Sequence, residues 1–421
     1  MLWLLALAVS RPLWAAVAID ISADKESGVY AVGDTATWTV NVTNDGQPAT
    51  GEVAWNVQQG GLAQIAGGKQ ALEAGKATLK GTRADAGTLL LNVVYEPTPG
   101  QRTQGLGGAV FGPEQIKPSA PAPDDFDTFW AGKIAELKAV PMNVQITPVD
   151  IGRADIEYYK IDMDGYKGSK IHGQLAKPKG KTSLPGLLQV QWAGVYPLSR
   201  DWVVGPASQG WLAFNIIAHD LPIDEPAQFY KDQDANQLKG YPMIGREDRE
   251  TSYFLRMYLS CYRAVDYLLS RPEHDGKTVL VQGGSQGGGQ SLVTAGLHPA
   301  VTAIAADVPA MCDHTGHLAD RAPGWPRLCG WGLKPDSEKA LATSRYFDAV
   351  NFAARAHCKT ALVGIGLIDT TCPPAGCLAA YNALPCTKQL VLMPKRGHGG
   401  DHGAYYSAYG KFVDQVKNAA K

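Results

Sequence analysis

Six short apolar segments between residues 187 and 393 constrain the fold of this chain more than any other feature. Several are apolar on both faces, as strands buried inside a parallel sheet are. An amphipathic helix is expected over 250–270, and a closing helix after Tyr406. Strands alternating with helices indicate a doubly wound, mostly parallel α/β sheet with right-handed crossovers. The expected strands are Leu187–Trp192, Trp211–Ile217, Thr278–Gln282, Val301–Ala306, Thr360–Ile365 and Gln389–Met393.

Residues 19–112 follow a different pattern. Thr35–Val42 alternates polar and apolar side chains, Thr88–Tyr95 is a second β-rich run, and turn signals such as Thr43–Gly46 lie between them. Short strands at this spacing predict a small all-β, Ig-like sandwich. The segment contains neither His nor Cys, so we expect it to be dispensable for chemistry.

A proline-rich linker over 113–123 separates this sandwich from an α/β domain expected over 124–421. Proline stiffens a connecting segment and cannot continue a strand interior, which favours a domain boundary here. Asp124 or Asp125 is expected to cap the first helix after the linker. The linker prolines are Pro113, Pro118, Pro121 and Pro123.

The N-terminus is typical of an export signal. Met1–Ser10 is almost wholly apolar, and Ala16–Ala18 forms a small-x-small cleavage site. We therefore expect residues 1–18 to be a signal peptide and the mature protein to be periplasmic or extracellular. No other stretch is apolar enough to cross a membrane, so no integral span is expected after processing.

Charge and cysteine pattern exclude several classes of protein. The net charge is −1, and no basic stripe offers the clustered Lys and Arg that nucleic-acid binding requires. None of the seven cysteines forms a CxxC pair, which excludes a zinc ribbon and a thioredoxin-type motif. One irregular stretch holds four potential zinc ligands, Cys312, His314, His317 and Asp320, but their spacing fits no helix motif. The sequence predicts no metal and no cofactor.

A disulfide is predicted between Cys358 and Cys386. Each cysteine lies a short distance before an expected strand, and those two strands should be parallel neighbours. The two thiols would then sit side by side, and a bridge closing a loop of this size could contribute about 3–4 kcal/mol.

The segment Gly283-Gly284-Ser285-Gln286-Gly287 matches the pattern G-x-S-x-G. The expected strand 278–282 runs into it and an expected helix over 288–297 leaves it, which is the context of a nucleophile elbow. Such a turn exposes the Ser285 hydroxyl and directs the N–H of Gln286 toward a developing oxyanion. The segment lacks the Lys-Ser/Thr ending of a phosphate-binding loop. The sequence thus indicates the α/β-hydrolase fold.

A serine nucleophile needs a base and an acid, which should follow later strands in the order acid, then histidine. Asp369 follows the expected strand 360–365, and His398 follows 389–393. Open α/β sheets place their sites at these carboxyl ends. Two other histidines compete as the base, but we expect His402 at the start of the last helix and His219 in a wall of the active site.

The second oxyanion donor is expected from the loop after the strand 187–192. Gly194 lets this backbone bend, and the N–H of Val195 is the candidate donor. Trp192 and Tyr196 flank the loop, and Trp325 and Trp331 lie in the segment 321–333. These rings are candidate substrate-binding residues, because they could narrow an acyl pocket and offer flat faces to a sugar.

The second domain resembles the acetyl xylan esterase and cephalosporin C deacetylase family, carbohydrate esterase family seven. The resemblance rests on the motifs Phe129-Trp130, Arg263–Leu268, Gly283–Gly289, Ala306–Pro309, Cys312-Asp313 and Gly366–Pro374. It implies removal of acetyl groups from sugar hydroxyls, with catalytic roles for Ser285, His398 and Asp369 and an oxyanion contact at Val195. It also implies an acetylated oligo- or polysaccharide partner and a possible homo-oligomer.

The sequence leaves two other functions to consider. A broader carboxylesterase or a peptidase would use the same residues on the same fold. A catalytically silent carbohydrate-binding protein belongs to a different class, and the complete set of three catalytic residues argues against it.

Overall fold

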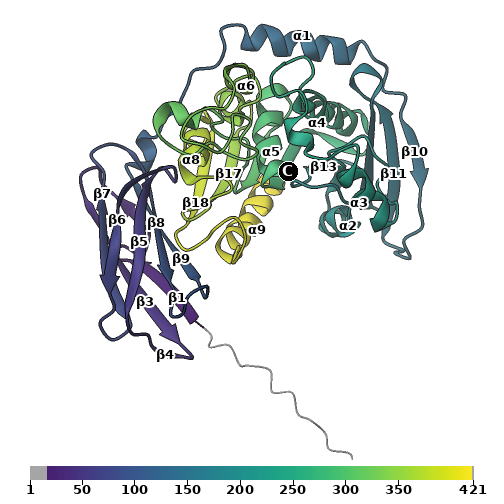
Figure 1. The fold of residues 1–421 in the computed structure, drawn as a ribbon. Helices are drawn as coiled ribbons and strands as arrows, with labels where there is room; N and C mark the ends of the chain where they lie inside the picture. Colours follow the sequence, from purple (N-terminus) through teal and green to yellow (C-terminus); the bar gives the residue numbers. More distant parts are fainter. Residues whose placement is uncertain (1–16, 420–421) are drawn as a thin grey trace, which may run out of the picture.

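The computed structural model describes residues 17–419, and Figure 1 shows that they form two parts. Over 17–111 the chain makes two facing sheets. Their strands are β1 (Val17–Ala23), β2 (Val29–Tyr30), β3 (Thr35–Asn44), β4 (Gln47–Pro48), β5 (Glu52–Gln59), β6 (Ala63–Ala71), β7 (Lys76–Thr82), β8 (Gly87–Tyr95) and β9 (Thr103–Phe111). One sheet has the order β1-β3-β4 with β7 paired to β3, and the other has the order β2-β9-β8-β5-β6.

The sandwich core comes from the alternating side chains of these strands. Trp38 and Val40 of β3 pack with Leu91 and Val93 of β8, and all four are buried. The expected strands 35–42 and 88–95 therefore coincide with β3 and β8, because period-two alternation sorts side chains between the two faces of a sheet.

The expected signal peptide lies almost wholly outside the described residues. Within 17–419, Val17 and Ala18 belong to β1 and pair with Asn44 and Thr43 of β3. Over the same residues, no helix has both the length and the apolarity that a membrane crossing requires. Export therefore stays a prediction.

The second part contains a nine-stranded sheet with the order β10-β11-β12-β14-β13-β15-β16-β17-β18 over the described residues. The strands are β10 (Gln145–Pro148), β11 (Ile156–Asp164), β12 (Lys170–Pro178), β13 (Leu184–Gln189), β14 (Leu212–Ile216), β15 (His274–Gly284), β16 (Ala303–Asp307), β17 (Thr360–Gly366) and β18 (Thr387–Met393). The strands from β14 to β18 are parallel, and β10, β11 and β12 pair antiparallel at one edge.

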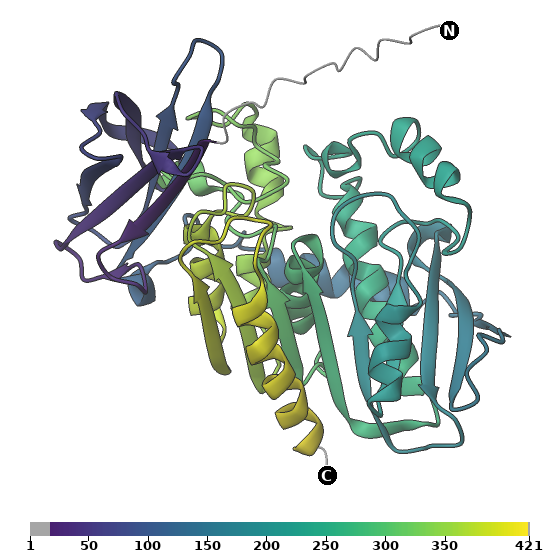
Figure 2. The ribbon, with the colours of Figure 1, turned by 90° about the horizontal axis from the view of Figure 1, so that it is seen from below.

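Helices cover both faces of this sheet, as Figure 2 shows. One face packs against α4, α5 and α8, and the other packs against α2 and α9. The helices are α1 (Phe126–Lys138), α2 (Asp201–Ser208), α3 (Ala227–Ala235), α4 (Tyr253–Ser270), α5 (Gln286–Leu297), α6 (Glu338–Ser344), α7 (Ala349–Ala353), α8 (Pro374–Ala383) and α9 (Gly403–Asn418). The prediction of a doubly wound, mostly parallel α/β sheet is confirmed.

A strand forms at each of the six expected places, but β13 (Leu184–Gln189) begins and ends three residues before the expected Leu187–Trp192. The antiparallel strands β10, β11 and β12 were not expected, and α9 begins at Gly403, before the predicted start. The sequence of β11 does not show an apolar strand pattern, because one face of the strand is only half-buried and carries polar side chains such as Glu157 and Lys160 next to Tyr159.

The linker is fastened to the second part rather than free. The Asn382 side chain donates hydrogen bonds to the carbonyl oxygens of Pro113 (2.8 Å) and Ile116 (2.9 Å). The Ser119 hydroxyl donates to the Asp313 carboxylate at 2.7 Å. Asp125 stands at the N-cap of α1, but its carboxylate bonds to Arg249 and Tyr346 and not to the helix.

Cys358 and Cys386 lie next to each other, as the parallel pairing of β17 and β18 requires. Their sulfurs are 3.4 Å apart and both residues are thiols, whereas a disulfide has an S–S length of about 2.05 Å. The predicted bridge is therefore absent from this structure, although the two residues are neighbours.

Candidate active site

Ser285 occupies a sharp turn between β15 and α5. Its backbone has φ 55° and ψ −120°, a strained conformation for a residue with a Cβ. A Cβ on Gly283 would come within 2.6 Å of the Gly287 backbone, and one on Gly287 within 2.6 Å of the Val190 carbonyl oxygen. The turn can therefore form only because both positions are glycine.

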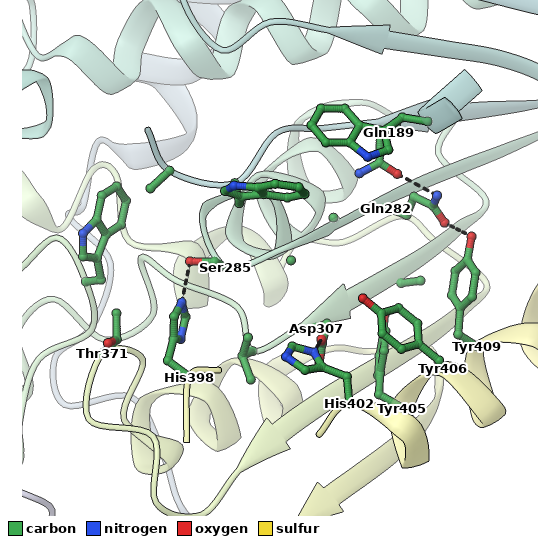
Figure 3. Close-up of a pocket in the computed structure, with 18 residues that line it drawn as sticks. Gln189, Gln282, Ser285, Asp307, Thr371, His398, His402, Tyr405, Tyr406 and Tyr409 are labelled. Carbon is green, nitrogen blue, oxygen red and sulfur yellow. Dashed lines mark hydrogen bonds and ion pairs between the residues drawn. The ribbon is translucent and has the colours of Figure 1, made fainter. Parts of the chain in front are cut away.

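Ser285, His398 and Asp369 form a continuous hydrogen-bonded chain, part of which is visible in Figure 3. His398 Nε2 lies 2.9 Å from the Ser285 Oγ, and His398 Nδ1 lies 2.9 Å from Asp369 Oδ2. A carboxylate only accepts hydrogen bonds, so Nδ1 carries the proton and Nε2 is free to accept from the serine. This is the tautomer that a general base requires.

The second oxygen of Asp369 is held by the backbone of its own loop. Asp369 Oδ1 accepts the N–H groups of Thr371 and Cys372, both at 2.8 Å. The Asp369 side chain is fully buried, so these two hydrogen bonds replace those that its carboxylate would otherwise make to water. They fix the plane of the carboxylate and leave Oδ2 directed at His398.

His402 does not contact Ser285. Its Nδ1 donates to Asp307 Oδ2 at 2.8 Å, and its Nε2 accepts from the Arg396 guanidinium at 2.8 Å. Arg396 also pairs with Asp307 through two contacts, at 2.9 and 3.2 Å. Both ring nitrogens of His402 are thus occupied, although the ring lines the same cavity as Ser285 and stands at the N-cap of α9.

His219 supports the 193–195 loop from behind rather than forming a wall of the cavity. It is fully buried. Its Nε2 donates to the Gly194 carbonyl at 3.0 Å, which leaves Nδ1 to accept from the Tyr253 hydroxyl at 2.7 Å. Burial lowers the pKa of His219 to about 4, so the ring is neutral near pH 7.

The two candidate oxyanion donors lie on segments that share one buried tyrosine. The Tyr241 hydroxyl accepts from the Gly194 N–H at 3.4 Å and donates to the side-chain oxygen of Gln286 at 2.6 Å. Gly194 precedes the candidate donor Val195, and Gln286 is itself the other candidate. Tyr241 therefore holds the two segments at a set separation. The sequence offered no signal for it, because it lies in an irregular segment far from both motifs.

We predict that Tyr241→Phe lowers kcat about tenfold while leaving KM within about twofold, because oxyanion contacts act mainly in the transition state. The substitution removes one hydroxyl and keeps the buried ring. Steady-state kinetics on an acetyl ester measure the effect, and Tyr230→Phe is a control for loss of a buried tyrosine hydroxyl that bonds to a loop carbonyl. An unchanged kcat would show that the Tyr241 hydroxyl does not help to position the oxyanion donors.

A cavity of about 700 Å³ opens beside Ser285. Trp192 and Trp325 line it. Tyr196 is not among the lining residues; it stacks on Trp192 with ring centroids 5.4 Å apart. Trp331 does not line this cavity: it is 70 % exposed and lies at a second, smaller cavity beside the sandwich. Sequence reasoning missed several lining side chains, namely Trp202 of α2, Tyr406 and Tyr409 of α9, Gln189 and Gln282.

The potential zinc ligands of residues 312–320 do not gather into a ligand set. His314 and His317 are buried, whereas Asp320 is exposed. Within residues 17–419, the ligand atoms of three such side chains come within 4.8 Å of one another only at Asp369, Cys372 and His398. Two of those three residues already bond to each other in the chain that ends at Ser285.

Comparison with known proteins agrees with this geometry. The family model for acetyl xylan esterase (AXE1) matches residues 114–415. Acetyl esterase Axe7A from Xylanibacter ruminicola is 32 % identical over 394 residues, which cover 92 % of this chain and 88 % of that protein. Because it covers 92 % of this chain, that match includes much of the sandwich, which lies before the start of the family model at residue 114.

Two solved structures share the fold of the second part. The acetyl xylan esterase from Paenibacillus sp. R4 is 30 % identical with a TM-score of 0.63, covering 72 % of this chain and 98 % of that one. Acetyl xylan esterase 1 from Thermoanaerobacterium sp. JW/SL YS485 is 22 % identical with a TM-score of 0.61, covering 73 % and 97 %. On the breadth of the family match and the identity to these relatives, this chain, a carboxylic ester hydrolase of the α/β-hydrolase fold, belongs to the acetyl xylan esterase family.

Proposed function

We propose that this protein removes acetyl groups from acetylated xylan or xylo-oligosaccharides, with Ser285 as nucleophile, His398 as general base and acid, and Asp369 as the residue that orients His398. The observation that carries the proposal is the hydrogen-bonded chain from Ser285 to Asp369 at the edge of an open cavity. Membership of the family and the names of two relatives, both acetyl xylan esterases, support the choice of substrate.

The reaction would proceed by acyl transfer. His398 Nε2 takes the Ser285 proton as Oγ attacks the acetyl carbonyl carbon, and the carbonyl oxygen becomes an oxyanion that the N–H groups of Gln286 and Val195 stabilise. His398 returns the proton to the departing sugar oxygen, which leaves an acetyl-serine. Water, deprotonated by His398, then attacks this ester, and acetate leaves as Ser285 regains its proton.

The cavity offers both kinds of contact that a sugar chain uses. The rings of Trp192 and Trp202 pack edge to face, with centroids 4.9 Å apart, on one side. Tyr406 of α9 contributes a further ring that is 62 % exposed. Gln282 donates to the side-chain oxygen of Gln189 at 2.7 Å, and these amides could also bond to sugar hydroxyls. Aromatic faces and amides together favour a carbohydrate alcohol over a lipid one.

A steep preference for short acyl groups is the prediction that tests this function. Trp325 is fixed by the hydrogen bond of its backbone N–H to the Thr371 carbonyl at 3.0 Å and by an edge contact with Phe254. Displacing its ring to make room for a longer acyl chain would therefore cost free energy. We expect kcat/KM to fall at least roughly tenfold from acetyl to butyryl nitrophenyl esters, about 1.4 kcal/mol in transition-state binding.

The same screen separates the alternatives. Acetylated xylo-oligosaccharides should release acetate, and peptide substrates should stay intact. Equal or rising rates with octanoyl esters would indicate a broader carboxylesterase, and cleavage of peptides would indicate a peptidase. A protein that binds the oligosaccharide and hydrolyses none of the esters would be the silent carbohydrate-binding protein.

We further propose that the protein is exported to the periplasm or the medium. The apolar run and small-residue site at the N-terminus support this, and N-terminal sequencing of the mature protein tests it. A homo-oligomer is also proposed, on the family resemblance, and sedimentation velocity would measure it.

A further inference from the structure

The loop that carries Asp369, residues 366–374, rests on the sandwich. A Cβ added to Gly108 of β9 would come within 2.6 Å of the Leu367 carbonyl oxygen, and one on Gly28 within 2.7 Å of the Leu367 side chain. Leu367 is buried and lies two residues before Asp369. The backbone of the sandwich therefore contacts the back of the Asp369 loop directly, without an intervening side chain.

A second connection reaches the same loop from the tip of the β5–β6 hairpin. The Gly60 carbonyl accepts the Ala322 N–H at 2.9 Å, which ties the hairpin to the segment 321–333. That segment continues to the Asp369 loop, where the Trp325 N–H donates to the Thr371 carbonyl at 3.0 Å and Arg327 donates to the Thr370 carbonyl. Thr370 and Thr371 directly follow Asp369, so the loop is held on both sides of the carboxylate.

The sandwich is also fixed relative to the second part. The linker bonds to α8 through Asn382. Lys395, three residues before His398, pairs with Asp20 of β1 at 2.8 Å. Both side chains of this ion pair are exposed, so the pair contributes little stability by itself.

The sandwich and the Asp369 loop also share a cavity of about 240 Å³. Leu89 and Leu90 of β8 line it together with Asp369 and Thr370. Figure 1 shows the sandwich lying beside β17, β18 and α8.

We propose that the sandwich is a positioning element of the active site, acting through the contact of Gly108 and Gly28 with Leu367 to hold the Asp369 loop in register with His398. This inference rests on the triad assigned under the proposed function. It replaces the expectation that the sandwich is dispensable for chemistry. A displacement near 1 Å of a positioned catalytic group can cost about 10²-fold in rate, and the two bonds that orient Asp369 come from the loop that the sandwich supports.

Gly108→Ala in the full chain tests the proposal, because the added methyl group must push Leu367 and its loop away. We expect kcat on an acetyl nitrophenyl ester to fall 10- to 100-fold, with KM changed less than about twofold, since Trp192 and Trp202 lie on other elements. Labelling of Ser285 by a fluorophosphonate should slow in parallel, because it depends on the same base.

Gly107→Ala and Gly105→Ala are matched controls on the same strand. Their added methyl groups would meet Ile21 at 2.8 Å and Ile19 at 2.6 Å, inside the sandwich core. Both controls should lower the melting temperature and keep kcat within about twofold of wild type, as expected for strain remote from the site. If the contact at Gly108 only stabilises the fold, Gly108→Ala will also lower the melting temperature and keep kcat within about twofold of wild type. That result would overturn the proposal.

Leu367→Ala removes most of the leucine side chain that contacts the sandwich and introduces no clash. It replaces Gly108→Ala as the test if Gly108→Ala does not fold. Its control is Leu362→Ala on β17, where the leucine packs on the α9 face of the sheet. We expect Leu367→Ala to lower kcat more than Leu362→Ala does, per active site titrated. Equal effects would also overturn the proposal. Failure of the proposed function would look different, because Ser285→Ala would then keep the activity of the wild-type chain.

Discussion

Ser285→Ala should lower kcat for acetyl esters by roughly 10⁴- to 10⁶-fold, the range expected when a nucleophile that acts with its base is removed. The mutant keeps the cavity and the oxyanion donors but has no oxygen within reach of His398 Nε2. The double mutant Ser285→Ala/His398→Ala should be no slower than either single mutant, because the residues act as one unit. Single-turnover acetate release measures all three, and a fluorophosphonate probe should label Ser285 in the wild type alone.

Ser291→Ala is the matched control for this experiment. Ser291 lies on α5, and its buried hydroxyl donates to the Gly287 carbonyl at 2.8 Å, away from His398. Its loss should change kcat by less than a few fold. Labelling at any residue other than Ser285, or full activity in Ser285→Ala, would falsify the assignment of the nucleophile.

Asp369→Asn should lower kcat about 10⁴-fold, the scale known for this exchange in serine hydrolase triads. The reason lies in the loop backbone. Thr371 and Cys372 donate N–H groups to Oδ1, and only the carbonyl oxygen of an asparagine can accept them. The NH₂ group of the asparagine must then face His398 Nδ1 and donate to it. The histidine proton moves to Nε2, which can no longer accept the proton of Ser285.

Circular dichroism should show Asp369→Asn to be folded, and its KM should stay near that of the wild type, because the substrate does not contact this residue. Fluorophosphonate labelling of Ser285 should slow together with kcat. A loss of less than tenfold would mean that a different carboxylate orients the base. Asp307 would then be the one to test, since it already bonds to His402 in the same cavity.

Much of the candidate site could be predicted because its signals are local. Glycine at 283 and 287 around Ser285 is required by the turn itself, and that requirement is visible in five consecutive residues. Asp369 and His398 follow buried strands, and the carboxyl ends of parallel strands converge at one edge of the sheet whatever the rest of the fold is. The order of strands and loops along the chain was therefore enough to bring three distant side chains together.

Residues recruited from elsewhere had no comparable signal. Tyr241 lies outside every motif, and its role follows only from the place where its hydroxyl meets Gly194 and Gln286. Trp331 shared its segment and residue type with Trp325, yet one faces the Ser285 cavity and the other the sandwich. Residue type predicts that a ring will pack against something, but only the path of the backbone decides what it meets.

The sequence by itself determined the alternation of buried strands and helices, the nucleophile turn, and the strands that carry the acid and the base, because each depends on side-chain periodicity or on the steric needs of a few adjacent residues. The tertiary structure decided that His402 bonds to Asp307 and Arg396, that His219 supports the loop at Gly194, and that Gly108 of the sandwich meets Leu367. Apart from the bond between His402 and Arg396, these contacts join residues at least 25 positions apart in the chain. Tertiary packing brings such residues together, and no local pattern records it.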